Sequence, residues 1–236
     1  MKRILLPLVL LACSLPAFAA DREKVVDRLN AAATVLDEIM AAPDKGIPEE
    51  IIGSAKCVAV VPSYLKGGFI VGGSYGKGVA TCRTSSGAWS APAMFRMEGG
   101  SFGLQIGGEA VDLIMLVMND QGMERLLSSK FKLGADASAA AGPVGRHAEG
   151  TTDWKLRAQV LTYSRSRGIF AGLTVNGSTL RQDKDDTRVF YGRMVRFRTS
   201  LTGAVPVPGD AQKFVSTVGK YAGGNTPPPP PPQTPQ

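Results

Sequence analysis

The sequence predicts an α+β fold: a single domain with a strongly curved antiparallel β-sheet that tends to a flattened barrel, packed by an N-terminal, a central and a C-terminal helix. Residues 21–42 and 210–221 show apolar side chains at helical spacing. Between them, short runs rich in Val, Ile, Phe and Tyr are separated by Gly, Ser and Pro, which is typical of strands and hairpins. This order of elements favours an α+β domain.

The first residues are typical of a secretory signal. Lys2 and Arg3 precede an apolar run, and the small residues Ala17-Phe18-Ala19 follow it. We therefore predict a signal peptide over residues 1–19 and an exported protein of the periplasm or cell envelope, attached to the membrane surface or not. A second interpretation stays open, because Leu10-Leu11-Ala12-Cys13 resembles a lipobox in which Cys13 would carry a lipid.

The helices and strands follow from local patterns. Asp21 caps the first helix and Pro43 ends it. The nearly continuous apolar run 112–119 predicts a buried strand, and a short helix follows from Asp120. Residues 154–181 alternate polar and apolar side chains and predict a hairpin that turns at Asn176-Gly177. The folded domain spans residues 20–222, and the Gly/Pro-rich residues 223–236 are expected to be a disordered polyproline tail.

A glycine-rich stretch at residues 62–78 invites comparison with a nucleotide-binding loop. The motif G-x-x-x-x-G-K-[ST] fails here, because Val71 replaces a required glycine and Gly78 replaces the required hydroxyl residue. The stretches 68–72, 103–107 and 168–172 share an apolar-rich triplet between two glycines. Since glycines inside strands mark bends, bulges or close approaches, we expect three strands bent strongly enough to curl the sheet.

Charge and cysteine content limit the partners. The formal net charge is +7, and removal of Lys2 and Arg3 leaves 25 basic residues against 20 acidic ones. A mild surplus of this kind suits an anionic surface. Cys57 and Cys82 lie in strand-like segments, where they form either a disulfide or two buried free thiols, and the sequence leaves both alternatives open.

No arrangement of residues indicates catalysis. His147 is the single histidine, and no G-x-S-x-G motif accompanies it, although a hydrolase using His147 stays an alternative. Zinc spacing is missing, and the acidic run 183–186 lacks the ligand pattern of a calcium loop. We predict no enzyme activity, no cofactor and no metal. We also predict no nucleic-acid partner, because the basic residues are dispersed.

Four segments, residues 47–83, 89–119, 130–146 and 163–181, together resemble the SYLF-domain family. The strongest part reads IPEEIIGSAKCVAVVPSYLKGGFIVGGSYGKGVATCR, and the resemblance covers residues 25–222 in consistent order. It implies a phospholipid- or phosphoinositide-binding domain without enzyme activity. For eukaryotic members it also implies actin-related functions.

The resemblance implies lipid contacts at particular basic residues. In the N-terminal helix these are Arg22, Lys24 and Arg28; Lys66 stands at the basic-then-double-glycine turn, and Lys77 and Arg83 follow on nearby strands. The leading hypothesis is an exported module that binds an anionic phospholipid at the cell envelope, with no actin partner expected. The alternative is a structural or partner-binding envelope protein whose prolines 227–232 act as a spacer or docking segment.

Overall fold

The computed structural model describes residues 15–42, 46–69, 71–102, 107–128, 130–144, 158–166, 169–172, 175 and 177–223. Within these ranges the centre of the fold is one nine-stranded sheet in the order β5-β9-β3-β2-β1-β4-β7-β6, with β8 paired to β7. All pairings are antiparallel except β6–β7. The strands are β1 Cys57–Phe69, β2 Val71–Cys82, β3 Ala93–Phe102, β4 Gly107–Val117, β5 Lys130–Lys132, β6 Ala139–Ala141, β7 Val160–Ser166, β8 Ile169–Gly172 and β9 Thr179–Gln182.

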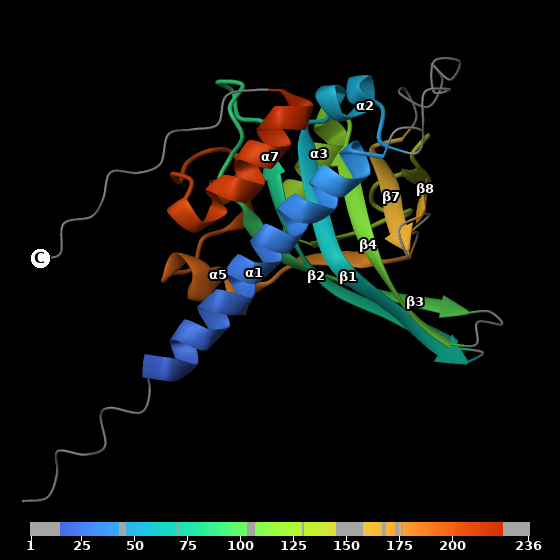
Figure 1. Cartoon of the computed structure of the whole chain (residues 1–236), viewed down its shortest axis with the longest axis horizontal. Coiled ribbons are helices and arrows are strands. Elements are labelled where there is room, and N and C mark those ends of the chain that lie inside the picture. The colour runs from blue at the N-terminus through green and yellow to red at the C-terminus, as the bar shows by residue number, and fades with distance from the viewer. Residues whose placement is uncertain are drawn as a thin grey trace, which may run out of the picture.

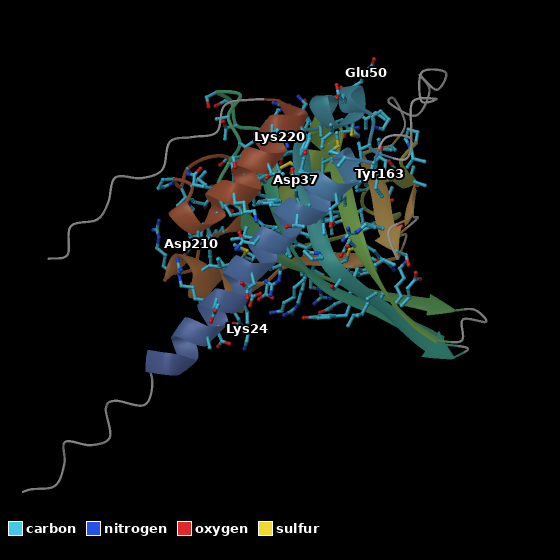
Figure 2. All side chains as sticks on the ribbon, viewed as in Figure 1. Lys24, Asp37, Glu50, Tyr163, Asp210 and Lys220 are labelled. Atoms are coloured by element: carbon cyan, nitrogen blue, oxygen red, sulfur yellow. A yellow bond between two sulfur atoms is a disulfide. The ribbon has the colours of Figure 1, made fainter. Side chains whose placement is uncertain are left out.

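Helices α1 and α7 cross one face of this sheet, which we call the helix face (Figure 1). Helix α7 lies along α1, and Lys220 and Tyr221 of α7 both contact Asp37 of α1 (Figure 2). The predicted α+β class with a curved sheet and packed helices is confirmed. The helices are α1 Leu15–Met40, α2 Glu49–Ser54, α3 Asp120–Leu127, α5 Lys184–Tyr191, α6 Phe197–Leu201 and α7 Gln212–Ala222, with a short 3₁₀ turn at Gly209–Ala211.

Both faces of the central strands are buried. On the helix face, Val60, Val79 and Ile114 join the apolar sides of α1 and α7 in one core cluster. On the opposite face, Phe95 and Leu113 belong to a second cluster. A strand buried on both faces has apolar residues without alternation, which is why residues 112–119 form a nearly continuous apolar run.

Helix α1 begins at Leu15, earlier than the predicted start at Asp21. Its buried stripe includes Val25, Leu29 and Leu36, and the other side faces solvent. Residues 20–24 are all exposed, and Figure 1 shows this end of α1 projecting beyond the sheet. The signal-peptide prediction stays a prediction, and Cys13 lies outside the described residues.

The expectation that glycine-flanked triplets bend strands was wrong where the structure describes them. Gly68 lies directly opposite Gly72, so this stretch ends the β1–β2 hairpin instead of bending one strand. Residues 103–106 and Gly168 lie outside the described residues. The irregularity of β1 is a bulge near Ser63, which has a φ of 57° and donates its backbone N–H to Asp112 Oδ1 at 3.0 Å.

The predicted hairpin at Asn176-Gly177 was also wrong. Gly177 has the positive φ of a turn residue, 87°, but β9 pairs with β3 and β5, whereas β8 pairs with β7. The two segments that flank the turn are therefore not partners. A local turn motif predicts only that the chain reverses direction. Which strands then pair depends on the edges that other, distant strands offer for hydrogen bonding.

A pair of cysteines covalently joins the two strands of the β1–β2 hairpin. Cys57 and Cys82 lie directly opposite each other in the β1–β2 register and form a disulfide. Of the alternatives that the sequence left open, the structure therefore contains the bonded form. None of the described helices is long and apolar enough to cross a membrane.

Candidate functional site

A row of basic residues crosses the helix face of the sheet. Arg96 of β3 lies directly opposite Lys77 of β2 on one side and Arg181 of β9 on the other, and Lys130 of β5 lies opposite Arg181. Directly opposite residues share a face, and Val79 and Met94 nearby identify it as the helix face. We call Lys77, Arg96, Arg181 and Lys130 the cation row.

The middle of the cation row has unused hydrogen-bond donors. The Nε of Arg181 is shielded from solvent and has no hydrogen-bond partner among the described residues. The Nε of Arg96 lies 3.1 Å from Glu98 Oε1, but the pair is not aligned for a hydrogen bond. Like charges directly opposite each other destabilise a sheet, and buried donors without partners add to that cost. An anion placed over this row would relieve the repulsion between the like charges.

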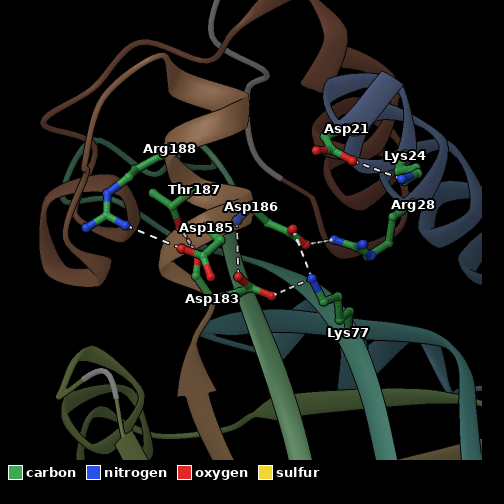
Figure 3. Close-up of polar contacts among 9 residues, drawn as sticks. All are labelled: Asp21, Lys24, Arg28, Lys77, Asp183, Asp185, Asp186, Thr187 and Arg188. Atoms are coloured by element: carbon green, nitrogen blue, oxygen red, sulfur yellow. Dashed lines mark hydrogen bonds and ion pairs between the residues drawn. The ribbon is translucent and has the colours of Figure 1, made fainter. Parts of the chain in front are cut away.

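Lys77 has strong partners within the protein. Its Nζ lies 2.9 Å from both Asp183 Oδ2 and Asp186 Oδ1, and Arg28 of α1 bonds Asp186 Oδ2 at 2.6 Å (Figure 3). Asp183 also caps α5, because its Oδ1 accepts the backbone N–H of Asp186. The acidic run 183–186 thus begins a helix and links it to β2 and α1.

The environment shifts the pKa values of this cluster in opposite directions. Burial alone would raise the pKa of Asp183, but the hydrogen bond and charge of Lys77, helped by the Asp186 backbone N–H, hold it below its usual value. Burial alone would lower the pKa of Lys77, but the hydrogen bonds and charges of Asp183 and Asp186 raise it. Both groups are therefore stabilised in their charged forms.

The three basic residues expected to bind lipid from α1 are instead paired within the protein. Arg22 lies 2.5 Å from Asp210 and over the ring of Phe190, and Lys24 lies 2.9 Å from Asp21. With Arg28 held by Asp186, the structure does not gather these three cations into one site.

Arg83 connects the C-terminal ends of two helices. Its guanidinium donates to Gly53 O and Ala55 O at the end of α2, and to Ala222 O and Gly223 O at the end of α7. It also stacks 4.7 Å from the ring centroid of Trp89. A cation at two helix C-termini satisfies carbonyls that lack partners within their helices. Its hydrogen bonds therefore point into the protein.

Lys66 lies on an extension of the sheet that we call the glycine arm, the ends of β1 to β4 that reach past the helices (Figure 1). Lys66 is directly opposite Ser74 and Glu109. Its Nζ lies 6.0 Å from the ring centroid of Tyr64, and burial lowers its pKa while the charge of Glu109 opposes that shift. Lys66 and the cation row thus point to opposite faces of the sheet, since Lys66 shares the face of buried Tyr64.

Across the glycine arm runs a second row, made only of glycines. Gly73 of β2 lies opposite Gly100 of β3 and Gly67 of β1, and Gly67 lies opposite Gly108 of β4. Two apolar residues beside this glycine row, Leu65 and Tyr75, are 54% and 43% exposed. A groove of about 630 Å³ is lined here by Leu65, Lys66, Gly67, Gly73, Ser74, Tyr75, Gly99, Gly108, Glu109 and Ala110.

Comparison with known proteins gives the family. Residues 98–221 match the model of the Ysc84 family, described as "Las17-binding protein actin regulator". The chain belongs to the Ysc84 family. The SYLF resemblance seen in the sequence is thereby confirmed, and the description of the family names binding and regulation, with no reaction.

Several relatives of this Ysc84-family protein carry the same domain in longer chains. The SH3 domain-containing YSC84-like protein 1 of Rattus norvegicus is 36% identical over 180 residues, which are 76% of this chain and 53% of the relative. The human protein of that name is 37% identical over 171 residues, 72% of this chain and 50% of the relative. Protein YSC84 of Saccharomyces cerevisiae is 33% identical over 168 residues, which are 70% of this chain and 36% of the relative. The chain thus spans about half or less of their lengths.

The comparisons correct one expectation about partners. We expected no actin partner, but the family is described as an actin regulator, and a further relative from yeast is named LAS seventeen-binding protein 3. Export of the chain was the sole ground for that expectation, and export is itself only predicted. The expectation of no actin partner is therefore wrong for the family to which this chain belongs.

Of the six basic residues singled out in the sequence, Lys77 alone belongs to the cation row. Arg96, Arg181 and Lys130 were missed because they are far apart in the sequence and each is one cation inside an ordinary strand. The usable signal was alternation, since each has at least one apolar neighbour that points to the other face: Phe95 and Met97 beside Arg96, Leu180 beside Arg181, and Phe131 beside Lys130. In the described ranges, no group of three or more His, Cys, Asp and Glu side chains could hold a metal ion.

Proposed function

We propose that this Ysc84-family domain is a non-enzymatic module that binds an anionic phospholipid surface at the cell envelope, and that the cation row contacts the headgroups. The observation that carries the proposal is the direct opposition of four basic side chains across β2, β3, β9 and β5. Lys130 at the end of the row and Lys132 beyond it are exposed, so a surface can approach from that side.

Phosphate oxygens match what the cation row lacks. Guanidinium N–H groups bind phosphate through short, charge-assisted hydrogen bonds, and the Arg96 side chain is 38% exposed. The negative charge of a bound phosphate also offsets the repulsion between the like charges that face each other across the strands. Each basic residue near an anionic surface contributes about 1 kcal/mol, so three or four in one row give useful affinity.

The test is co-sedimentation of the protein with vesicles of phosphatidylglycerol and phosphatidylcholine. The double variant Lys130→Gln/Arg181→Gln should bind about thirtyfold more weakly, because two contacts of about 1 kcal/mol each are lost. The control is Lys24→Gln/Arg188→Gln, which removes the same charge from two exposed pairs outside the row. Its binding should fall by much less than that of the row variant.

Two results would count against the proposal. Absence of wild-type binding to both anionic and neutral vesicles would exclude the membrane surface as ligand. Equal weakening of both double variants would show that net charge alone drives binding, so the cation row would not be the site. Binding through the row should also weaken from 50 to 200 mM salt, because exposed charges are screened.

A second candidate function is binding to a protein of an actin-linked assembly. The names of the family and of its yeast relatives favour it, since they print Las17 binding and actin regulation. Co-sedimentation of the purified domain with actin filaments, using the same two double variants, separates this candidate from vesicle binding. A domain that pellets with filaments but not with vesicles would favour the protein partner.

Export to the envelope is part of the proposal and has its own measurement. The intact mass of the protein purified from the periplasmic fraction should equal that of residues 20–236, and reduction should raise it by two hydrogens because of the Cys57–Cys82 disulfide. A mass that includes residues 1–19 would contradict cleavage at the predicted site. A mass that starts at Cys13 with added lipid would identify a lipoprotein.

A further inference from the structure

A second basic surface lies around the connection between α5 and α6, outside the cation row. Residues 188–198 read RVFYGRMVRFR and contain four arginines but no acidic residue. The two outer arginines have carboxylate partners: Arg188 lies 3.3 Å from Asp185 (Figure 3), and Arg198 lies 2.6 Å from Glu124. The charges of these two arginines are therefore offset within the protein.

The two inner arginines lack such partners. Arg193 and Arg196 are exposed, and none of the ion pairs or hydrogen bonds among the described residues involves their side chains. Met194, which follows Arg193, is 38% exposed and is one of three large apolar side chains that are exposed in the described ranges. We call Arg193, Met194 and Arg196 the loop patch. It combines two unused charges with an exposed apolar group.

The loop patch is presented by a well-anchored stretch of backbone. Gly192 ends α5 in the left-handed conformation with a φ of 66°, and the hydroxyl of Tyr191 donates to Pro92 O at 2.5 Å. Within the patch the side chain of Val195 is buried, and its carbonyl oxygen accepts a hydrogen bond from Gln182 Nε2 at 2.6 Å. Because contacts hold the chain on both sides, the exposure of the patch is a property of the fold.

The loop patch also lies near the exposed end of the cation row. Gln182, which bonds to the loop, directly follows Arg181 on β9, and Lys130 of β5 lies opposite Arg181. Lys130 and Lys132 are exposed. A surface that approaches the row from this end therefore comes close to the loop patch as well.

A bilayer interface matches both parts of the patch. Phosphate oxygens accept charge-assisted hydrogen bonds from guanidinium groups. The hydrocarbon begins just below the headgroups, where interfacial protein segments bury their apolar side. Arginine can keep its charged head at the phosphates while its apolar stem and neighbours lie deeper. A purely acidic peptide would satisfy the arginines but would leave the Met194 side chain in water.

We propose that the α5–α6 connection is the part of the domain that enters an anionic bilayer. Met194 inserts below the headgroups, and Arg193 and Arg196 bind the phosphates on either side of it. The inference rests on the proposed function, since it takes the anionic phospholipid surface as ligand. It adds the orientation of the bound domain, with the loop patch and the exposed end of the cation row towards the membrane.

Insertion is measured by tryptophan fluorescence of the full chain bound to vesicles of phosphatidylglycerol and brominated phosphatidylcholine. Bromine on the acyl chains quenches a tryptophan that reaches them. Met194→Trp should therefore be quenched more strongly than the wild type, whose Trp89 is buried. Leu65→Trp places the same probe at an exposed apolar position on the glycine arm and should be quenched less than Met194→Trp.

Affinity is measured by co-sedimentation with unbrominated vesicles of the same composition. Met194→Asp should bind about tenfold more weakly, and Met194→Leu like the wild type, because the first alone loses the apolar insertion. Arg193→Gln/Arg196→Gln should bind about thirtyfold more weakly, since two basic contacts are lost. The matched control Lys24→Gln/Lys213→Gln removes the same charge from exposed positions on α1 and α7 and should weaken binding much less. All these side chains are exposed, so the melting temperatures should equal that of the wild type.

The outcomes separate this inference from the proposed function. An unquenched Met194→Trp on bound vesicles, or wild-type affinity of Met194→Asp, would overturn the insertion site, while weaker binding of the cation-row variant would still support the proposed function. Failure of the wild type to bind anionic vesicles would remove both. Loss of binding to a decaglutamate peptide in Arg193→Gln/Arg196→Gln, with unchanged vesicle binding, would overturn the inference in favour of an acidic protein partner.

Discussion

Replacement of Lys77 by alanine is expected to lower the free energy of unfolding by about 3 kcal/mol at pH 7. Lys77 neutralises Asp183, whose side chain is 2% exposed, and loss of one partner of a buried ion pair leaves an uncompensated charge. Arg28 stays near the cluster through Asp186 and limits the effect. Urea denaturation followed by circular dichroism measures the change, and Lys24→Ala, from an exposed pair, should change it by less than about 0.5 kcal/mol.

The pH dependence provides an independent check on this cluster. Because the pKa of Asp183 is lowered in the folded state, its contribution is present above the ordinary carboxyl pKa and is lost as the pH falls through the folded value. Because the pKa of Lys77 is raised, its contribution is present below the ordinary lysine pKa and is lost as the pH rises through the folded value.

In Lys77→Ala the burial of Asp183 is no longer opposed by its main partner, so its pKa should rise. The stability gap between wild type and variant should therefore narrow as the pH is lowered from 7 towards 4. Stability curves that stay parallel over this range would show that the Lys77–Asp183 contact is not what the substitution removes.

The second large effect is expected at Arg83. Arg83→Ala should destabilise the fold by about 3 kcal/mol, because four backbone carbonyls lose a charged hydrogen-bond donor. These are the carbonyls of Gly53, Ala55, Ala222 and Gly223. Arg83→Lys should recover less than half of the loss, since an ammonium group cannot reproduce the planar fork over Trp89. Hydrogen exchange should show faster exchange at the ends of α2 and α7.

A control distinguishes this structural role from lipid contact. Arg83→Ala should leave vesicle affinity unchanged at a temperature where the variant is fully folded. If Arg83→Ala had normal stability but bound vesicles much more weakly, our assignment would be wrong and Arg83 would be a lipid contact. The Trp89 indole N–H donates to Gly223 O at 2.7 Å, so a shift in Trp89 fluorescence would report loosening at the end of α7.

Much of the fold followed from local sequence. The apolar stripe of α1, the double-sided apolar run of β4 and the helix α7 were predictable because their patterns reflect burial on one face or two. The family followed from segments that hold the same order along the chain, and the comparison confirmed it. The prediction that the glycine-flanked triplets bend strands was wrong, because glycine is equally compatible with a bend and with the end of a hairpin.

By itself, the sequence determined the class of fold, the main helices and the family. Tertiary structure alone decided which strands pair and which charges meet: Arg96 and Arg181 are adjacent because β9 adds to the edge of β3. It also decided that Arg28 and Lys77 share Asp186, and that four glycines stand in one row. Local patterns encode burial and turns, whereas register between distant strands depends on competition among all the edges of the folded sheet.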